Sequence, residues 1–317
     1  MTGSLRELEG FDLIELIYQA TCQVPEGMVS TYGDIAKAIG DVRAARAVGA
    51  ILSRYPRRDT PVPCHRIVYG DGRVGWYNGL GKGTDEKSGR LEAEGVHLKH
   101  GMVMEFGTTR FQDFRVRPVL KEMRDEQERM ARKVKEKGPA HFRYAIGLDV
   151  SYADDRDAFA AAVIYDLESG KVEERTTKCA IDFPYIPTYL GFREVPVVAP
   201  LLKDIEDAVL LVDGQGRLHP RCFGIACHLG VRFGIPTVGV AKSHLTGEVG
   251  DDGSITLEGR VTGKKVRARG KEYYVSVGNQ ITLQDAVSMA ETCLSAPESD
   301  VLRRAHVAAN RFRRECG

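Results

Sequence analysis

Cys64 and His65 are the first residues in this chain whose types and spacing suggest chemistry. They stand together in the stretch PVPCHRIV, at the end of an apolar extended run. A cysteine attacks well only as a thiolate, so it needs a base or a positive neighbour, and His65 can relay its proton. Glu94, in the stretch LEAEGV, can orient that histidine as the third member of a triad does. By spacing alone, a buried structural Cys-His pair is the commoner explanation.

A second set of chemical groups consists of carboxylates near the ends of apolar runs. Asp149 ends the predicted strand YAIGLDVSY, and Asp213 ends AVLLVDGQG. Carboxylates at the ends of neighbouring strands can converge on one hard cation. Glu194, in LGFRE, would complete a cluster suited to Mg²⁺-assisted phosphodiester hydrolysis, and Lys242 could neutralise phosphate charge in the transition state. Taken singly, an Asp-Gly pair after a strand is only a turn, and a lysine there is only a solvated strand end.

Two short helices must position the cysteine. Ser30 and Thr31 are N-cap candidates for a helix through residues 34–36, which Gly40 would end. A second helix, over residues 43–53, is dominated by alanine and glycine. The pair predicts a helix-turn-helix just before Cys64. Its small side chains allow either tight helix packing or insertion into a DNA groove.

The second half of the chain has a different pattern of apolar residues. Strand-like apolar runs alternate with helical segments, which indicates an α/β sheet; the runs cover residues 144–150, 159–165, 208–212 and 237–241. A charged amphipathic helix is expected over residues 119–136. We place the domain boundary near residue 115, which predicts one domain over residues 1–115 and another over residues 116–317.

Composition narrows the class of protein. The 317 residues suffice for two domains, each with its own core. The formal net charge of +1 gives no support for nucleic-acid binding, so any such surface must come from local basic clusters, such as the run over residues 260–271. The odd total of 7 scattered cysteines does not indicate a disulfide framework. Without a recognisable signal peptide or membrane span, we expect a cytoplasmic protein with no membrane partner.

The motifs of the first half, taken together, identify a family. VPEGMVSTYGDIA, RAARAVGAIL, PVPCHRIV, DGRVGWYNG and LEAEGV, in this order, resemble the DNA-binding and catalytic domain of O6-alkylguanine-DNA alkyltransferases. The resemblance covers residues 11–107 and implies a helical, winged-helix-like fold that binds DNA containing O6-alkylguanine. It implies irreversible transfer of the alkyl group from the flipped guanine to Cys64, with His65 and Glu94 activating the thiol. The same resemblance implies contacts to DNA and the lesion by Tyr32, Arg46, Tyr77 and Asn78.

The motifs of the second half resemble another family. GLDVSY, FPYIPTYLGFREVP, VDGQGRLHPR, IPTVGVAKSHL and VSVGNQITLQDA strongly resemble endonuclease V. The resemblance implies a ribonuclease-H-like α/β fold with a mixed sheet, and DNA cleavage at the second phosphodiester 3′ to deoxyinosine. It implies that Mg²⁺, or Mn²⁺ in its place, is bound by Asp149, Glu194 and Asp213, with Lys242 and His219 assisting. Tyr185, Ile186 and Pro187 would form a strand-separating wedge. Asn279 stands where members commonly have a histidine near the metal.

The sequence therefore predicts a bifunctional DNA-repair enzyme, a methylated-DNA–protein-cysteine methyltransferase joined to a deoxyribonuclease V. An alternative hypothesis treats the first half as a sensor of alkylated DNA that transfers nothing. In that alternative, the second half is an inosine-specific nuclease that acts on DNA or RNA.

Overall fold

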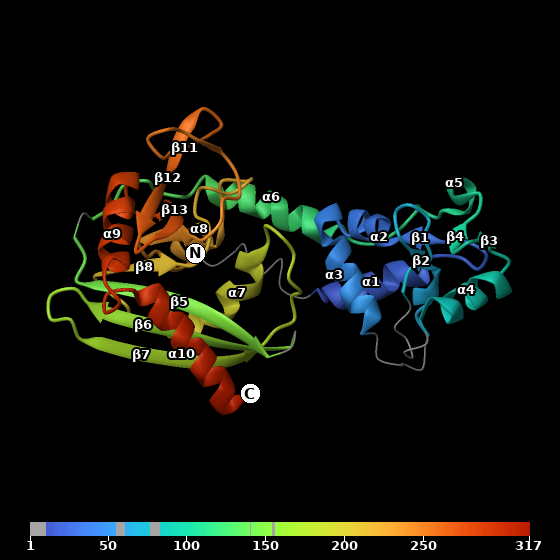
Figure 1. Ribbon diagram of the computed structural model, residues 1–317, viewed down its shortest axis with the longest axis horizontal. Helices are drawn as coiled ribbons and strands as arrows, with labels where there is room; N and C mark the ends of the chain where they lie inside the picture. Colours follow the sequence, from blue (N-terminus) through green and yellow to red (C-terminus); the bar gives the residue numbers. More distant parts are fainter. Residues whose placement is uncertain (1–10, 55–60, 77–82, 140, 154–155) are drawn as a thin grey trace. The chain divides into compact units, whose positions relative to one another are not determined.

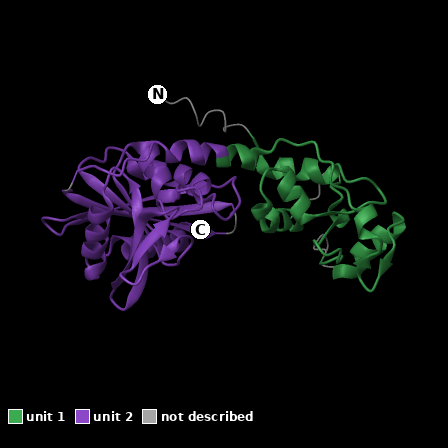
Figure 2. Ribbon diagram, turned by 90° about the horizontal axis from the view of Figure 1, so that it is seen from above, with its two compact units in different colours: residues 1–124 green, residues 125–317 purple. Residues whose placement is uncertain are grey.

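The computed structural model describes residues 11–54, 61–76, 83–139, 141–153 and 156–317. The chain divides into two compact units, Met1–Arg124 and Asp125–Gly317 (Figure 2). The division falls within one helix, α6 (Val119–Ala131). Each unit has its own apolar core, in agreement with the two-domain fold class expected from the sequence.

The N-terminal unit is mainly helical (Figure 1). The helices and short strands, in chain order, are α1 (Leu13–Cys22), β1 (Ser30–Thr31), α2 (Tyr32–Ala38), η1 (Val42–Ala44), α3 (Ala45–Ser53), η2 (Cys64–Arg66), β2 (Ile67–Val68), α4 (Gly83–Ala93), β3 (Leu98–Lys99), β4 (Met102–Val103) and α5 (Phe106–Thr109). Thr31 caps α2 through a capping box with Asp34. Helices α2 and α3 form the expected helix-turn-helix, with the short η1 between them.

The C-terminal unit contains one mixed sheet. Its strands and helices, in chain order, are β5 (Tyr144–Ala153), β6 (Asp157–Asp166), β7 (Val172–Ala180), α7 (Leu190–Val198), η3 (Ala199–Leu202), β8 (Ala208–Val212), α8 (Ile225–Phe233), β9 (Thr237–Ala241), β10 (Glu248–Val249), β11 (Ser254–Leu257), β12 (Arg260–Ala268), β13 (Lys271–Asn279), α9 (Leu283–Ser295) and α10 (Val301–Cys316). In the described residues the strand order is β10-β11-β12-β13-β9-β8-β5-β6-β7. Strands β5, β8 and β9 run parallel, and the other pairs are antiparallel.

Helices cover both faces of this sheet (Figure 1). Helices α7 and α8 pack on one apolar face through residues such as Val195 and Leu229. Helix α9 and the start of α10 cover the other face. Gly147 of β5 permits a close approach of α10, because a Cβ atom added there would lie 2.2 Å from the Val301 carbonyl oxygen. The sheet is therefore a central layer that presents its strand ends to the neighbouring helices.

The helix expected over residues 119–136 ends at Ala131. Beyond it, the chain pairs with the end of β13 instead of continuing the helix. The Lys135 amide donates to the Asn279 side chain over 2.9 Å, and the Gln280 amide donates to the Lys135 carbonyl over 2.6 Å. These bonds use backbone groups that another helical turn would need.

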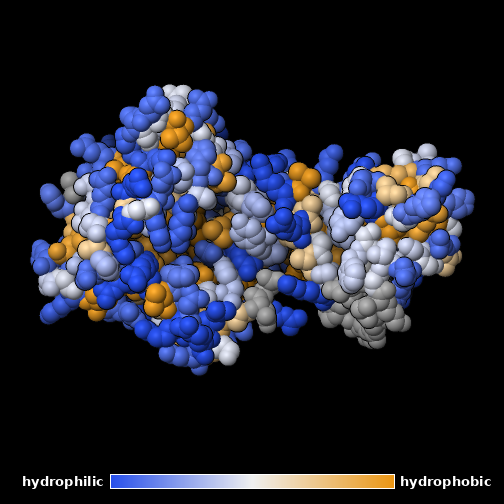
Figure 3. All heavy atoms as spheres, in the orientation of Figure 1, coloured by the Kyte–Doolittle hydropathy of each residue, from blue (hydrophilic) through white to orange (hydrophobic). Residues whose placement is uncertain are grey.

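Hydrophilic side chains cover much of the face seen in the space-filling view, with apolar side chains in small patches (Figure 3). Within the residues that the structure describes, no helix combines the length and the apolar character that crossing a membrane requires.

Candidate active sites

The short strand pair β1–β2 brings Cys64 to the start of the helix-turn-helix. Ser30 pairs with Ile67, so Tyr32, which opens α2, and Cys64, which opens η2, both flank one parallel ladder. Cys64 is partly buried, and its amide donates to the Val62 carbonyl over 2.8 Å. Two segments far apart in the sequence thus form one site around the thiol.

His65 is held by Glu94 of the loop that follows α4. The His65 Nε2 and Glu94 Oε1 atoms lie 2.7 Å apart, and Arg66 binds both carboxylate oxygens of Glu94 at 2.8 Å. Burial lowers the pKa of His65, although its hydrogen bond to Glu94 acts in the opposite direction. The imidazole is therefore neutral at pH 7, and with its Nε2 proton donated to Glu94 the Nδ1 atom remains able to accept a proton.

The thiol itself is protonated at rest. Burial raises the pKa of Cys64 to about 12, and the charge of Lys87 opposes that rise. Lys87 is almost fully buried, donates to the Ile67 carbonyl and lies 5.8 Å from the centre of the Tyr32 ring. Burial lowers the pKa of Lys87 to about 8. A reaction at Cys64 therefore needs a proton acceptor, and His65 is available for that task.

A groove of about 600 Å³ lies beside this site, along the helix-turn-helix. Tyr32 and Arg46 both line it, as the alkyltransferase resemblance implies for residues that meet DNA. Tyr69, which is partly exposed, adds a second aromatic ring 5.8 Å from that of Tyr32. Tyr77 and Asn78, which were also expected at the lesion, lie outside the described residues.

The carboxylates of the C-terminal unit meet where the parallel ladder between β5 and β8 ends. Leu148 of β5 pairs with Val212 of β8, so Asp149 and Asp213 follow at neighbouring positions. Glu194 projects from α7, and all three side chains line one cavity of about 80 Å³. Asp213 follows β8 as the sequence predicts, but Asp149 was wrongly expected to end its strand, because β5 continues to Ala153 in its antiparallel pairing with β6. The packing of α7 adds the glutamate.

Each of these carboxylates also contacts a partner that carries a proton or a charge. Asp149 lies 3.2 Å from His306 of α10, Glu194 accepts from the Tyr152 hydroxyl, and Asp213 pairs with Lys242. Burial, followed by the charges of the two aspartates, raises the pKa of Glu194 to about 7. Burial also raises the pKa of Asp149. The cavity thus concentrates negative charge that is costly without a cation.

The oxygen donors fit a hard divalent cation. Across the described ranges, no three His, Cys, Asp or Glu side chains already form a metal-binding group. Burial alone would lower the pKa of Lys242, but its pairing with Asp213 raises it, so the side chain stays an ammonium. The Lys242 ammonium thus lies beside Asp213, and it is the positive side chain that the sequence suggested for neutralising phosphate charge.

Comparisons with known proteins show which family the chain belongs to. A family model described as "Endonuclease V" matches residues 127–307, and one described as "6-O-methylguanine DNA methyltransferase, DNA binding domain" matches residues 12–96. A "Bifunctional methyltransferase/endonuclease" of Picrophilus torridus is 34% identical over 300 residues, covering 94% of this chain and 96% of that protein. A protein of the same name from Thermoplasma volcanium is 35% identical over 300 residues, covering 95% of this chain and 90% of the relative.

This chain belongs to the bifunctional methyltransferase/endonuclease family. Both enzyme classes expected from the sequence are thereby confirmed. The crystal structure of human ENDOV is similar to the C-terminal part of this family member, with a TM-score of 0.56 and 29% identity over 62% of this chain and 100% of that chain. The expected fold class is confirmed as well.

Two residues of this bifunctional enzyme lie elsewhere than the endonuclease resemblance implies. His219 lies in a buried network beside the loop that precedes α7, with its Nε2 atom 3.2 Å from the Thr188 carbonyl, and it does not line the carboxylate cavity. Asn279 is buried and donates to the Gly230 carbonyl over 2.8 Å. It pairs with Thr237 at the start of β9, whereas Lys242 follows the end of that strand. Asn279 therefore lies away from the end of β9 that Lys242 follows, and it does not line the carboxylate cavity.

The histidine at the carboxylates is His306, which the sequence analysis did not single out. It sits in α10 among arginines that resemble an ordinary solvated helix face. Asn310, one turn later, donates to the His306 carbonyl and lies 3.0 Å from Ser151 of β5. The only signal in the sequence was the helical spacing of His306 and Asn310.

The proposed wedge follows β7 and leads into α7. Tyr185 is 60% exposed, whereas Ile186 is 1% exposed and anchors the turn in the protein. An exposed aromatic ring on an anchored turn is able to enter between bases, which is what the endonuclease resemblance implies for residues 185–187.

Proposed function

We propose that this enzyme removes alkyl groups from O6-alkylguanine in DNA and separately cuts DNA beside deoxyinosine. The observation that carries the proposal is the presence of two complete sets of reactive groups, one in each compact unit. Cys64, His65 and Glu94 form the first set, and the cavity lined by three carboxylates forms the second.

In the first reaction, the Cys64 sulfur attacks the alkyl carbon on O6 of guanine. An S–C bond forms as the C–O bond breaks, the thiol proton passes toward His65, and the released guanine takes up a proton. Glu94 stabilises the imidazolium that His65 becomes, because its carboxylate already accepts the Nε2 hydrogen bond. The thioether product is stable, so each molecule reacts once.

The guanine must leave the duplex, because its O6 substituent is out of reach inside the base stack. Tyr32 and Arg46, which line the groove beside the helix-turn-helix, support this step. Tyr32 would press on the target phosphate and rotate the nucleotide, and Arg46 would fill the vacated place in the stack. Tyr77 and Asn78 are proposed to contact the extruded base.

Mass spectrometry after incubation with DNA containing O6-methylguanine tests this reaction. The peptide with Cys64 is expected to gain one methyl group, and Cys64→Ser is expected to gain none. A protein that binds the alkylated DNA tightly without any mass change on Cys64 would instead be a lesion sensor. The exposed Cys22 provides the control, because Cys22→Ser keeps the reactive set intact.

In the second reaction, water hydrolyses the second phosphodiester on the 3′ side of deoxyinosine. Asp149, Glu194 and Asp213 would hold Mg²⁺, or Mn²⁺ in its place, which supplies electrophilic stabilisation of the phosphate charge. Lys242 adds a fixed positive charge beside Asp213. His306, next to Asp149, is placed to move a proton, and Tyr152 orients Glu194. Residues 185–187 would separate the strands, and His219 would act through the loop that carries them.

Cleavage assays with end-labelled strands test this reaction. The enzyme with Mg²⁺ is expected to cut deoxyinosine DNA at the stated bond, and Asp213→Ala is expected to cut at least about 10³-fold more slowly. Undiminished cutting by Asp213→Ala would refute the assignment. Faster cutting of an RNA strand that contains inosine would make RNA the substrate.

A further inference from the structure

The backbone of Thr188 is strained at the junction between the proposed wedge and α7. Its φ angle is +72°, in the left-handed region that a β-branched residue rarely adopts. Thr188 follows Pro187 directly and stands two residues before α7, the helix that carries Glu194. Such a conformation persists only where the surrounding structure imposes it.

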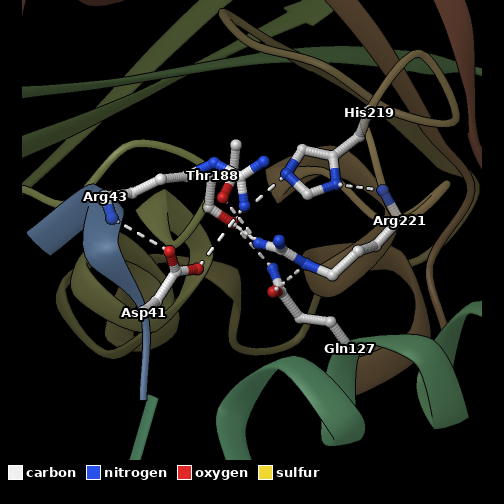
Figure 4. Close-up of polar contacts among 6 residues, drawn as sticks. All are labelled: Asp41, Arg43, Gln127, Thr188, His219 and Arg221. Atoms are coloured by element: carbon white, nitrogen blue, oxygen red, sulfur yellow. Dashed lines mark hydrogen bonds and ion pairs between the residues drawn. The ribbon is translucent and has the colours of Figure 1, made fainter. Parts of the chain in front are cut away.

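Arg221 is the main contact that holds Thr188 in place (Figure 4). Its guanidinium donates to the Thr188 carbonyl over 2.7 Å and to the Thr188 hydroxyl over 2.6 Å. The guanidinium also lies 4.8 Å from the centre of the Tyr189 ring. Arg221 is only 9% exposed, so these bonds are made largely out of water, where they are strong.

Gln127 and His219 complete the network around the same carbonyl (Figure 4). The Gln127 amide donates to the Thr188 carbonyl over 3.0 Å, and its oxygen accepts from Arg221 over 2.7 Å. The Arg221 amide also donates to His219 over 3.2 Å. Gln127 and His219 are 2% and 3% exposed. Gln127 therefore fixes the direction of the Arg221 guanidinium, and His219 holds the Arg221 backbone.

A second buried arginine holds the other end of this loop. Arg193 of α7 donates to the Phe183 carbonyl and lies 4.5 Å from the centre of the Tyr152 ring. The loop over residues 183–189 is thus attached at both ends to arginines, while Tyr185 between them is exposed. Only the Thr188 end carries backbone strain, so that end depends most on its contacts.

We infer that Arg221 is a positioning residue that holds the strained Thr188 backbone and thereby fixes the placement of Tyr185 and Glu194. This inference rests on the proposed function, which makes Tyr185 part of the wedge and Glu194 a metal ligand. It assigns Arg221, Gln127 and His219 to the loop instead of to the cation. We call the contacts of Arg221 with Thr188 the clamp. Loss of the clamp is expected to impair strand separation more than the chemical step.

Hydrogen exchange followed by mass spectrometry tests the clamp without any DNA. Arg221→Lys keeps the positive charge but loses the planar guanidinium with its several donors. In this variant, the rate of amide hydrogen exchange in the peptide over residues 183–192 is expected to rise about tenfold. Thr188→Gly removes the backbone strain, so adding Arg221→Lys to it is expected to change the exchange by no more than about twofold. An equal rise in both backgrounds would overturn the inference. Arg232→Lys, an exposed arginine of α8, is the control.

Cleavage of deoxyinosine in duplex and in single-stranded DNA tests what the clamp does. Arg221→Lys is expected to lower kcat/KM on duplex about tenfold more than on single strands, because single strands need no separation. Thr188→Gly combined with Arg221→Lys is expected to restore most of the duplex activity. Equal losses on both substrates would leave Arg221 with a merely structural role. Failure of the unchanged enzyme on both substrates would refute the proposed function, while the exchange experiment would still decide the clamp.

Discussion

Asp149 and His306 lie 3.2 Å apart, although 157 residues separate them in the chain. The contact forms because α10 packs directly on β5, across Gly147. A candidate acid–base group thereby reaches a carboxylate of β5, next to the point where β5 stops pairing with β8. The C-terminal helix is therefore part of the nuclease site and not only a cover for the sheet.

Replacing His306 by alanine is expected to slow cutting of deoxyinosine DNA by about 10²-fold, because a positioned proton-transfer group contributes about that much. Alkyl transfer to Cys64 is expected to stay unchanged. Single-turnover cleavage with Mg²⁺ measures the effect. His141→Ala, at an exposed histidine of the same unit, is the control. Equal rates for His306→Ala and the unchanged enzyme would remove His306 from the mechanism.

Metal binding is expected to weaken as the pH falls through 7. The pKa of Glu194 is raised to about 7, so below that pH a proton competes with the cation for the carboxylate. Each further pH unit should weaken Mg²⁺ binding by about tenfold, and the affinity should level off above pH 7. Calorimetric titration at several pH values measures this slope. In Glu194→Gln the slope should be clearly flatter, and an unchanged slope would assign the proton elsewhere.

Glu94→Gln is expected to slow alkyl transfer by about 10–10²-fold while leaving the nuclease intact. The amide keeps the shape of the side chain, but it no longer stabilises a protonated His65 and loses its charge pairing with Arg66. The rate of methyl uptake on Cys64 measures the change. Glu92→Gln alters an exposed glutamate of α4, two residues before Glu94, and should transfer at the unchanged rate. Similar losses of the transfer rate in both variants would mean that disturbance of helix α4, and not the charge of Glu94, causes the effect.

Gly147→Ala is expected to destabilise the C-terminal unit by about 1–3 kcal/mol, because the new Cβ atom would meet the Val301 carbonyl oxygen at 2.2 Å. The displaced α10 should also carry His306 away from Asp149 and slow cutting. Denaturant unfolding and cleavage assays measure both effects. Gly89→Ala, inside helix α4 of the N-terminal unit, places its Cβ atom in open space and should not destabilise the protein, because alanine favours a helix over glycine. A neutral Gly147→Ala would show that α10 can shift without cost.

Local patterns predicted the parts of the sites that lie near one another in sequence. Thr31 caps its helix through a side chain three residues away, and Asp213 follows an apolar strand, so short-range rules suffice for them. Asp149 was expected at a strand end, but its strand continues to Ala153, because pairing with β6 extends beyond the local apolar pattern. The motifs and their order along the chain also predicted both families.

Contacts that depend on tertiary packing could not be predicted from the sequence. His306 reaches Asp149 only because a helix near the C-terminus crosses β5, and no local rule sets that crossing. Asn279 was compared with a histidine near the metal, but β13 runs antiparallel to β9, and Asn279 pairs with Thr237 at the start of that strand. The strained backbone of Thr188 is likewise bound by Arg221, which is 33 residues away. The expected roles of Tyr77 and Asn78 stay predictions.

The most direct test of two separate sites on one chain gives both substrates to three proteins. The unchanged enzyme should take up a methyl group on Cys64 and cut deoxyinosine DNA in the presence of Mg²⁺. Cys64→Ser should cut at the unchanged rate without taking up methyl, and Asp149→Ala should take up methyl at the unchanged rate but cut at least about 10³-fold more slowly. A folded variant that loses both activities together, or methyl transfer that survives in Cys64→Ser, would contradict the account.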